Sequence, residues 1–591
     1  MANIMSQVDF RNKPSRNGFD LSMKRNFTAK VGEILPVWYK SIIPGDKFRI
    51  DLKSFTRTQP LNTAAYGRIR EYFDLYFVPM ESLWNKFPEV IQQLNDNPVH
   101  NAVGVSPSSA RYSGQLPFFT CASLATYINT MAKGIPAGGV NYNGYRRAPL
   151  TCKLLSYLGY PDFSAFLEEG NTWASNPFNV NLQLSPFPLL AYQRIYNDFF
   201  RFTQWENSQP SCFNIDFMKG LAGGVFNPWD IALLGSNTSD FFKYYNMFDL
   251  RYCNYNKDLL FGLLPQQQLG DTSVALLSGI IQAGDVTGAV SGNSINFSKA
   301  PVAGNNTGVA ISMGITDKSS AGIDILALRQ AEFLQKWKEV AQSAGKTYRE
   351  QVKAHWGVDV PVTSTHEPIY LGGTASSLNV GEVINNNITG DNAADIAGKG
   401  TFVQNGVIEF ETKGEYGILM CIYHAVPQID YIASNVDMDL TKVKATDWAI
   451  PEFDKIGMQS VPLSAFVLDN KDKFTSTNSA PLDNIPIGYA PRYIEYKTSL
   501  DRSMGAFASS LQSWIIGQNS RQLLSRIYGN DSPTGIYGSS VNYSLFKVSP
   551  ADVDSIFAVE ADDTVDTDQL LVESYFDIKA VRNLDVNGLP Y

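Results

Sequence analysis

The sequence predicts a mainly β protein, a Greek-key sandwich of antiparallel strands interrupted by long, partly helical insertions. Three observations lead to this fold class. Residues 28–79 carry apolar side chains at period two, which is the pattern of strands. Residues 80–357 lack that pattern, and it returns after residue 400 and again near the C-terminus. Strands from the two ends of the chain must then share sheets, as in a Greek key.

The clearest strand is Tyr66–Pro79. One face carries Ile69, Glu71, Phe73, Leu75 and Phe77, and the other carries Arg68, Arg70, Tyr72, Asp74 and Tyr76. Strict alternation indicates a strand, because successive side chains point to opposite faces. The second face combines charges with aromatic rings. It is therefore either solvated or covered by another subunit or segment of the chain.

Two further strands precede this one. The run that begins at Thr28 ends at Pro44-Gly45-Asp46, where Pro at i+1 and Gly at i+2 predict a type II turn. The next run places Phe48, Ile50 and Leu52 on one side. Three strands joined by turns favour an antiparallel sheet over βαβ units.

Residues 1–30 form a basic arm ahead of a single domain that we expect to span residues 31–591. Residues 1–70 hold 13 Lys and Arg against 5 Asp and Glu, whereas residues 551–591 hold 2 against 10. Because the whole chain has a net charge of −9, a polyanion would have to be met locally, at the arm. The candidate nucleic-acid-binding residues are Arg11, Lys13, Arg16, Lys24, Arg25 and Lys30, interleaved with Phe10, Phe19 and Phe27.

The arm has two interpretations. Cations with interleaved rings suit a single-stranded nucleic acid, because cations hold phosphates and bases stack on rings. The other interpretation is a flexible tail, or an arm that wraps a neighbouring subunit.

Residues 80–265 predict mixed helices and irregular loops inserted between strands. Their short aromatic segments do not continue the strand pattern, and Ser185-Pro186 is the expected entrance to a helix. Residues 268–322 contain nine Gly, five charged residues and one aromatic residue, Phe297. Such a stretch cannot bury a core of its own. We expect a surface loop or protrusion there, and its candidate residues are Gly284, Gly288, Gly292, Phe297 and Gly304.

Residues 323–357 predict a pair of helices. In the first, Leu326, Phe333, Trp337, Val340 and Ala344 form an apolar stripe, with Asp324 as the expected N-cap and Gly345 at the end. Thr347 and Glu350 form the capping-box pattern of a second helix that ends near Gly357. The β pattern then returns in the buried strand GEYGILMCIYHAVPQIDY and in LLVESYFDIKAVRNL near the C-terminus.

Composition favours an obligate assembly. The charged fraction of 18% is below the typical quarter, and aromatic residues make up 12% of the chain. The five cysteines are too far apart in sequence for a metal or redox motif, so we expect buried free thiols. The N-terminus lacks the apolar segment of a signal peptide, and the most apolar run, Gly417–Val426, is too short to cross a membrane.

The sequence contains no catalytic or cofactor motif, and we expect a protein that is not an enzyme and has no cofactor or metal. Gly345-Lys346-Thr347 imitates the end of a phosphate-binding loop, but Val340 replaces its first glycine and the segment joins two helices. The four histidines show no metal-binding spacing; they are His100, His355, His366 and His424.

Six segments occur in an order known from one protein family. They are IPGDKFRID, RTQPLNTAAYGRIREYFDLYFVPMESLW, SPFPLLAYQRIYNDFFR, ALRQAEFLQKW, KAHWGVDVP with PIYLGG, and LVESYFDIKAVR. In these segments the chain resembles the major capsid proteins of the Microviridae, single-stranded DNA phages, and within them gokushovirus-like members. The resemblance runs from about Phe10 to the C-terminus and is weakest over residues 211–322.

The resemblance implies one eight-stranded antiparallel jelly roll that forms a T=1 icosahedral shell around a circular single-stranded DNA genome. It implies a homo-oligomer in the virion, assembled in the host cytoplasm, with small internal DNA-binding or scaffolding proteins and a host receptor as further partners. In these relatives an insertion rises at the three-fold axes towards the host. Residues 268–322 are the candidate for it, and residues 133–148 are a second. The alternatives are a secreted β-sandwich protein that acts on glycans and a single-stranded DNA-binding protein.

Overall fold

The structure is a computed structural model, and it divides the chain into two compact units. The larger unit comprises Met1–Pro265 and Val360–Tyr591, and the smaller comprises Gln266–Asp359. The residues that the structure describes are 15–61, 66–93, 116–132, 144–167, 182–218, 247–273, 277–278, 322–323, 325–361, 366–384, 396–412, 414–432, 437–462, 465, 486–518, 546–553, 556–557 and 568–586.

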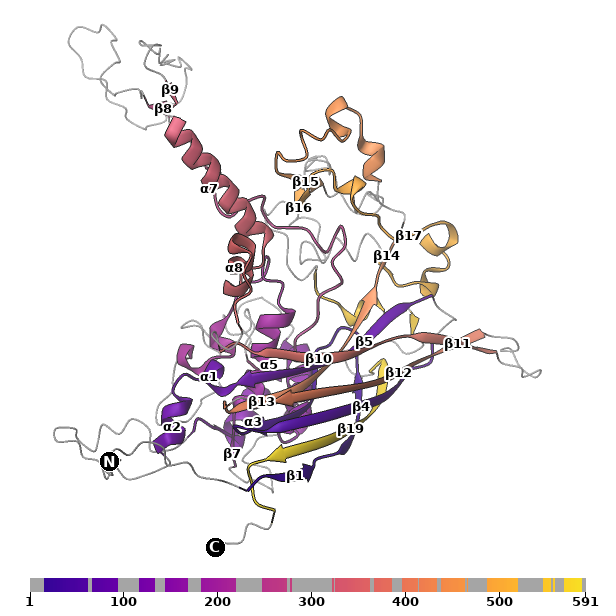
Figure 1. The fold of residues 1–591 in the computed structure, drawn as a ribbon. Coiled ribbons are helices and arrows are strands. Elements are labelled where there is room, and N and C mark those ends of the chain that lie inside the picture. The colour runs from indigo at the N-terminus through magenta and orange to yellow at the C-terminus, as the bar shows by residue number, and fades with distance from the viewer. Residues whose placement is uncertain are drawn as a thin grey trace, which may run out of the picture. The chain divides into compact units, whose positions relative to one another are not determined.

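Two antiparallel sheets form the framework of the larger unit (Figure 1). The six-stranded sheet has the order β1 (Asn17–Asp20), β19 (Leu570–Arg582), β4 (Lys47–Thr58), β12 (Ile396–Glu411) and β11 (Asn379–Ile384), with β2 (Met23–Ala29) also paired to β19. The four-stranded sheet has the order β10 (Ile369–Ser377), β5 (Arg68–Pro79), β13 (Gly417–Gln428) and β3 (Leu35–Ile42).

The two sheets pack face to face around one apolar core. The ring of Trp38 in β3 stacks on Phe576 in β19, with 6.0 Å between ring centroids. Phe77 in β5 lies 5.0 Å from Phe410 in β12 by the same measure. Side chains of β3, β4, β5, β12, β13 and β19 contribute to this core from the two sheets, as in a β-sandwich. The prediction of a mainly β protein with antiparallel sheets is confirmed.

Several strands that follow each other in the sequence lie in opposite sheets. β3 and β4 are joined by the predicted turn, in which Gly45 has a φ of +85° and Asp46 N donates to Ile43 O at 3.3 Å. β12 and β13 also follow each other and also lie in different sheets. As a result early strands pair with late ones: β4 pairs with β12 and β19, and β13 pairs with both β3 and β5.

This pairing of the two ends of the chain was predicted and is confirmed. The predicted count of eight strands differs from the sheets, which hold six and four strands. Part of the difference comes from the predicted arm, whose residues 17–29 pair with β19 as β1 and β2.

The strand predicted at Tyr66–Pro79 is β5 (Arg68–Pro79), and its alternating side chains point to two different faces of the sheet, as expected. The face that begins with Ile69 is buried throughout against the other sheet. On the second face Arg68 and Arg70 are exposed, whereas Asp74 and Tyr76 are buried. The cover over Tyr76 comes from the same chain, because a π-helical turn, η4 (Tyr196–Phe200), places Phe199 and Phe200 against its ring.

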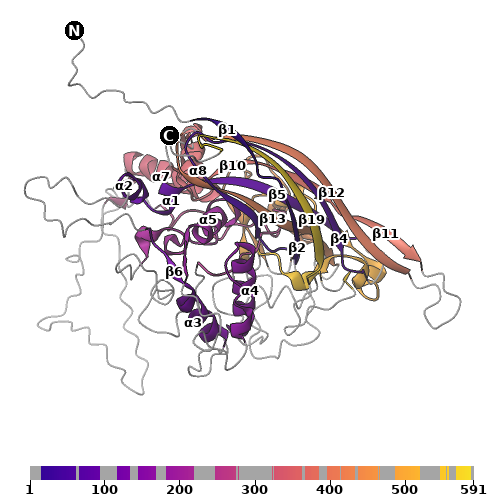
Figure 2. The same ribbon diagram turned by 90° about the horizontal axis from the view of Figure 1, so that it is seen from below.

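The insertion after β5 is helical, as predicted. Its helices are α1 (Met80–Leu83), α2 (Phe87–Gln93), α3 (Cys121–Ala132), α4 (Gly144–Tyr157) and α5 (Phe187–Ile195). α4 packs on β3, and α5 packs on β5 and β13, so these helices cover the four-stranded sheet on the side away from the six-stranded sheet (Figure 2). The Tyr192 hydroxyl in α5 donates to Ile34 O at 2.9 Å and ties the helix to the start of β3.

Short ladders complete the larger unit. They are β6 (Phe119–Thr120) with β7 (Gln183–Leu184), β15 (Met458–Pro462) with β16 (Pro486–Pro491), and β14 (Asp430–Ile432) with β17 (Arg502–Ser503) and β18 (Gly517–Gln518). The five cysteines are all buried and free, which confirms their prediction as structural thiols.

The smaller unit is built on the predicted helix pair, α7 (Ile325–Ser343) and α8 (Tyr348–Trp356). The capping box of Thr347 and Glu350 is present, and Gly357 ends α8 in the left-handed conformation. Both predictions are therefore confirmed, whereas Asp324 lies outside the described residues. The apolar stripe of α7 is exposed at Leu326, Phe333 and Trp337.

Candidate functional site

The predicted arm meets the sheet where the structure describes it. Residues 17–20 and 23–29 run along β19, with Asn17 opposite Arg582 and Met23 opposite Phe576. Phe10, Arg11 and Lys13 lie outside the described residues.

The described cations of the arm contact the protein itself. Arg16 Nη2 donates to Gly45 O at 3.1 Å, and Lys24 forms an exposed ion pair with Glu573. Arg25 is exposed, and Lys30 is half-buried with its backbone N–H donating to Glu33.

The two described aromatic residues of the arm are half-buried. The Phe27 ring packs edge-on against Tyr423 at 5.1 Å and against Phe73 at 6.3 Å between centroids, so it belongs to the core. Phe19 lies in β1 opposite Ala580. The DNA-binding role of the arm residues stays a prediction.

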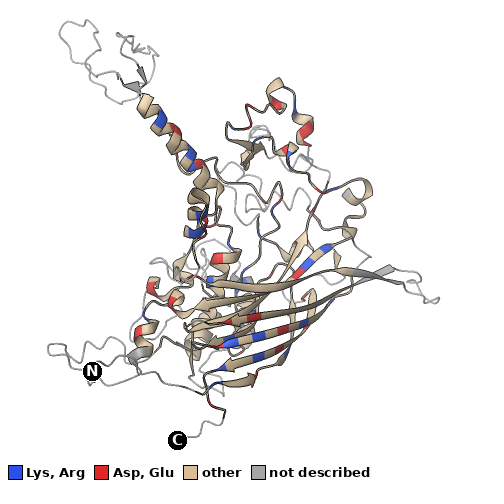
Figure 3. Ribbon diagram, in the orientation of Figure 1, with Lys and Arg blue, Asp and Glu red and all other residues tan. Residues whose placement is uncertain are grey.

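The outer face of the six-stranded sheet carries charges of both signs in cross-strand rows (Figure 3). In one row Asp20, Lys579, Arg49 and Glu409 face each other across four strands. Ion pairs along the face join Lys579 with Asp20 at 2.7 Å, Lys579 with Asp577 at 3.2 Å, Lys47 with Glu411 at 2.8 Å and Arg49 with Glu409 at 3.9 Å.

This face brings the basic beginning of the chain against its acidic end. Opposite charges on neighbouring strands attract, as between Lys47 and Glu411, whereas like charges repel, as between Lys579 and Arg49, which lie directly opposite each other. The excess of positive charge that the sequence shows in residues 1–70 is therefore partly matched by carboxylates of β12 and β19. The described sheet face is mixed in charge and does not form a basic patch.

A carboxylic acid lies buried between the two sheets. Glu71 of β5 is fully buried, and its Oε2 accepts a hydrogen bond of 3.2 Å from the Tyr423 hydroxyl. Burial raises the pKa of Glu71 to about 7, because the charged form loses its hydration. Its protonation state therefore changes near neutral pH.

A second titratable pair lies on the other face of the four-stranded sheet. His424 Nδ1 is 3.7 Å from Asp74 Oδ2, and the imidazole stacks on Tyr72 at 4.9 Å. Burial raises the pKa of Asp74 to about 6 and lowers the pKa of His424 to about 3. Phe200 packs edge-on against the imidazole and helps to exclude water.

The candidate protrusion lies in the smaller unit. Gly284, Gly288, Gly292, Phe297 and Gly304 lie outside the described residues, as do residues 133–143 of the second candidate. The two ends of the glycine-rich stretch are held together, because β8 (Leu277–Ser278) pairs with β9 (Gly322–Ile323) immediately before α7 begins. On the other side, Leu269 N donates to Lys338 O of α7 at 3.2 Å.

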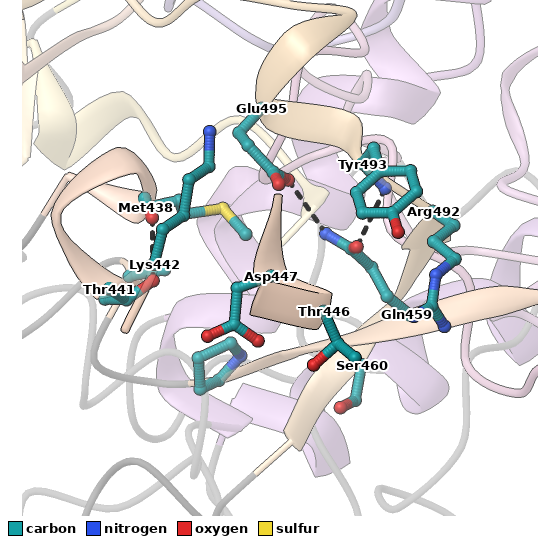
Figure 4. A pocket seen from close by; sticks show the side chains of 12 residues that line it. Met438, Thr441, Lys442, Thr446, Asp447, Gln459, Ser460, Arg492, Tyr493 and Glu495 are labelled. Atoms are coloured by element: carbon teal, nitrogen blue, oxygen red, sulfur yellow. Dashed lines mark hydrogen bonds between the residues drawn. The ribbon is translucent and has the colours of Figure 1, made fainter. Parts of the chain in front are cut away.

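A polar pocket of about 280 Å³ lies beside β15 and β16 (Figure 4). Gln459 organises it, because its Oε1 accepts from Tyr493 N at 2.8 Å and its Nε2 donates to Glu495 at 3.1 Å. The lining residues are Met438, Thr441, Lys442, Thr446, Asp447, Gln459, Ser460, Pro462, Ala465, Arg492, Tyr493 and Glu495. Its cations and carboxylates are equal in number, which differs from the strongly charged or metal-binding sites of many enzymes.

The described residues show no cluster of three or more His, Cys, Asp and Glu side chains that could hold a metal ion. Within the same residues, no helix is both long and apolar enough to cross a membrane. Sequence reasoning missed Asp74–His424 as a pair and the polar pocket. A signal for His424 was present, since it is the one histidine in the apolar run of β13.

Comparison with known proteins gives consistent results. The chain matches the family described as "Capsid protein (F protein)" over residues 6–134 and 173–591. It is 25% identical over 279 residues to "Capsid protein VP1" of Chlamydia phage 1, covering 46% of this chain and 43% of that protein. It is 23% identical over 546 residues to "Capsid protein VP1" of Bdellovibrio phage phiMH2K, covering 87% of this chain and 88% of that protein.

Proposed function

This chain belongs to the phage capsid (F protein) family, and on that premise we propose that it assembles into a T=1 icosahedral shell around a circular single-stranded DNA genome. The observation that carries the proposal is the family match, which extends over both strands of the central pairs β4–β19 and β5–β13. The function as a structural capsid protein of a Microviridae-like phage is consistent with both curated relatives.

The subunit in this proposal is a jelly roll. The support is topological, because in a jelly roll a long hairpin folds over so that its successive strands alternate between two sheets. β3 with β4 and β12 with β13 alternate in this way, and each pairs with a strand remote in the sequence. β1 and β2 extend one sheet beyond the eight strands of the simplest form.

The arm meets the genome on the inside of the shell. The support is the excess of Lys and Arg in residues 1–70, together with the mixed charge of the sheet face, which leaves the arm as the basic part of the chain. Each subunit needs only a weak hold on the DNA, because a closed shell repeats the contact many times. Small internal DNA-binding or scaffolding proteins are further partners in this proposal.

The smaller unit, residues 266–359, forms the outward protrusion at the three-fold axes and contacts the host receptor. Two features support this. The pairing of β8 with β9 brings the two ends of residues 279–321 next to each other, as is required of a long loop inserted at a single position of the unit. The exposed stripe of α7 also offers apolar surface that a lone subunit leaves in water.

Size-exclusion chromatography and negative-stain microscopy of the purified chain test the proposal. We expect closed particles of uniform diameter that contain DNA when they are isolated from infected cells, and no catalytic turnover. A stable monomer that binds single-stranded DNA, or one that cleaves glycans, would contradict a shell and favour one of the two alternatives.

A further inference from the structure

One segment of the larger unit contains no fully buried residue. From Asp437 to Ser460, all of which the structure describes, every residue is half-buried or exposed. Ten of these 24 residues are apolar or aromatic, which is close to the 44% of the whole chain. A segment of average hydrophobicity normally contributes to a core, so the absence of burial in a single copy requires an explanation.

The exposed apolar side chains are large and lie together. Leu440 is 77% exposed, Val443 is 83% exposed and Trp448 is 60% exposed. Lys442 joins them to the segment after β16, because its Nζ lies 5.7 Å from the Trp448 ring centroid and 3.5 Å from that of Tyr496.

A second link extends this surface to Ile456, which is also exposed. Lys497 Nζ lies 2.6 Å from Asp454 Oδ1 and donates to Arg492 O at 2.8 Å. The tight turn of Phe453–Ile456 is thereby held beside the residues that follow β16. We call Asp437–Ser460 together with Arg492–Lys497 the β15 surface.

At the centre of the β15 surface lies the polar pocket of Figure 4, with two polar groups that have no hydrogen-bond partner among the described residues. Tyr493 is only 4% exposed, and within the described part of the chain its hydroxyl makes no hydrogen bond. The buried Nε of Arg492 makes none with the described residues either. A buried donor without an acceptor costs free energy, so both groups would be stabilised by an oxygen acceptor that enters the pocket.

The backbone conformation of Tyr493 is unusual and fixes the position of its side chain in the pocket. Its φ of 56° is in the left-handed region, which a tyrosine rarely adopts. The hydrogen bond from Tyr493 N to Gln459 Oε1 maintains this conformation. Strain that the surrounding structure maintains is typical of binding positions.

We propose that the β15 surface is a contact between copies of this chain, in which a neighbouring copy covers the apolar side chains and places a carboxylate or carbonyl oxygen at Arg492 and Tyr493. This inference rests on the proposed shell. The composition supports a protein partner, because Trp, Tyr and Arg beside apolar residues are typical of interface centres. The partner's acceptor is readily available in a chain with 57 Asp and Glu.

The first experiment measures the concentration at which subunits assemble. Leu440→Glu with Val443→Glu should raise it at least about tenfold, because two charges would enter an apolar contact. Leu440→Met with Val443→Ile is the matched control and should assemble as the wild type does. Circular dichroism should be the same for all variants, since both positions are exposed in the single copy.

Tyr493→Phe tests the centre of the contact. It removes the hydroxyl alone and should raise the assembly concentration roughly threefold to tenfold, the equivalent of one hydrogen bond. Unchanged assembly of both Tyr493→Phe and the double glutamate variant would overturn the inference.

Hydroxyl-radical footprinting supplies a readout that does not depend on mutation. Trp448 and Tyr496 should react several-fold more slowly in shells than in free subunits. Equal reactivity in shells and subunits would show that the β15 surface faces solvent, where another molecule could bind, and would overturn the inference while leaving the shell intact. If the wild type forms no shells at all, the proposed function fails first.

Discussion

Nζ of Lys153 lies 2.8 Å from Oε2 of Glu33, and both side chains are buried. The same ammonium group lies 2.7 Å from Oδ1 of Asp568. Burial alone would lower the pKa of Lys153, but the two carboxylates raise it above its ordinary value, and Lys153 in turn opposes the rise that burial causes in the pKa of Glu33. The contact joins α4 to the segment between β2 and β3 and to the start of β19.

Lys153→Met should destabilise the protein strongly. The change leaves two buried carboxylates side by side without a cation, which typically costs about 3–5 kcal/mol. The urea midpoint of unfolding measures the loss, which should shrink at acidic pH as Glu33, whose pKa is raised by burial, becomes protonated.

Lys24→Met is the control for this change. Lys24 forms an ion pair with Glu573 in which both side chains are more than half exposed, so the loss should be at most about 1 kcal/mol. Equal losses for Lys153→Met and Lys24→Met would contradict the structural role of the buried contact.

Glu71 should make the stability depend on pH between about 4.5 and 7. Its pKa is about 7 in the folded protein and 4.5 in the unfolded chain. The contribution of Glu71 to the free energy of unfolding is therefore fully present below pH 4.5 and is lost as pH rises through 7. The size of this loss is roughly 3 kcal/mol, from 1.36 kcal/mol for each pKa unit.

Glu71→Gln isolates this contribution. The difference in unfolding free energy between variant and wild type should shift in favour of the variant as pH rises from 5 to 8. Asp74 and His424 also titrate in the folded or unfolded state, and comparing the two proteins at each pH cancels their contributions. A difference that is constant with pH would show that Glu71 is ionised throughout.

Neutralising the arm should reduce genome packaging. Replacement of Arg11, Lys13, Arg16, Lys24 and Arg25 by Gln removes the cations that we assign to phosphate contacts, and DNA per particle should fall. The ratio of absorbance at 260 and 280 nm in purified particles reports this. Glutamine replacement of Lys336, Lys346 and Lys353, which are exposed and lie outside both the arm and the β15 surface, is the control and should leave packaging unchanged.

Protease treatment of intact particles should cut first within residues 268–322. A protrusion presents its backbone to the enzyme, whereas the paired strands of the sandwich do not. Mass spectrometry of the early fragments locates the cut. First cuts in residues 133–148 would favour the second candidate for the protrusion, and protection of both stretches would contradict an outward position.

Several strands of the sandwich, and the sharing of sheets by early and late segments, could be predicted from the sequence, because those strands carry the period-two pattern or the apolar run of a buried strand. The strands β1, β2, β10, β11 and β12 were not predicted. β5, β13 and β19 appear where the alternation or apolar run predicts them, and the capping box of Thr347 and Glu350 begins α8 as expected. These features depend on neighbours in the sequence, and local sequence contains that information.

The contacts between charged side chains and between aromatic rings could be learned only from the tertiary structure. Lys153, Glu33 and Asp568 have no local pattern, since the chain brings them together from three distant segments. The same holds for Phe27, which the sequence suggested for stacking on bases and the fold places against Tyr423. The polar pocket at Tyr493 also depends on two segments that approach each other in space. Contacts of this kind follow from the packing of the sheets, which a one-dimensional pattern does not contain.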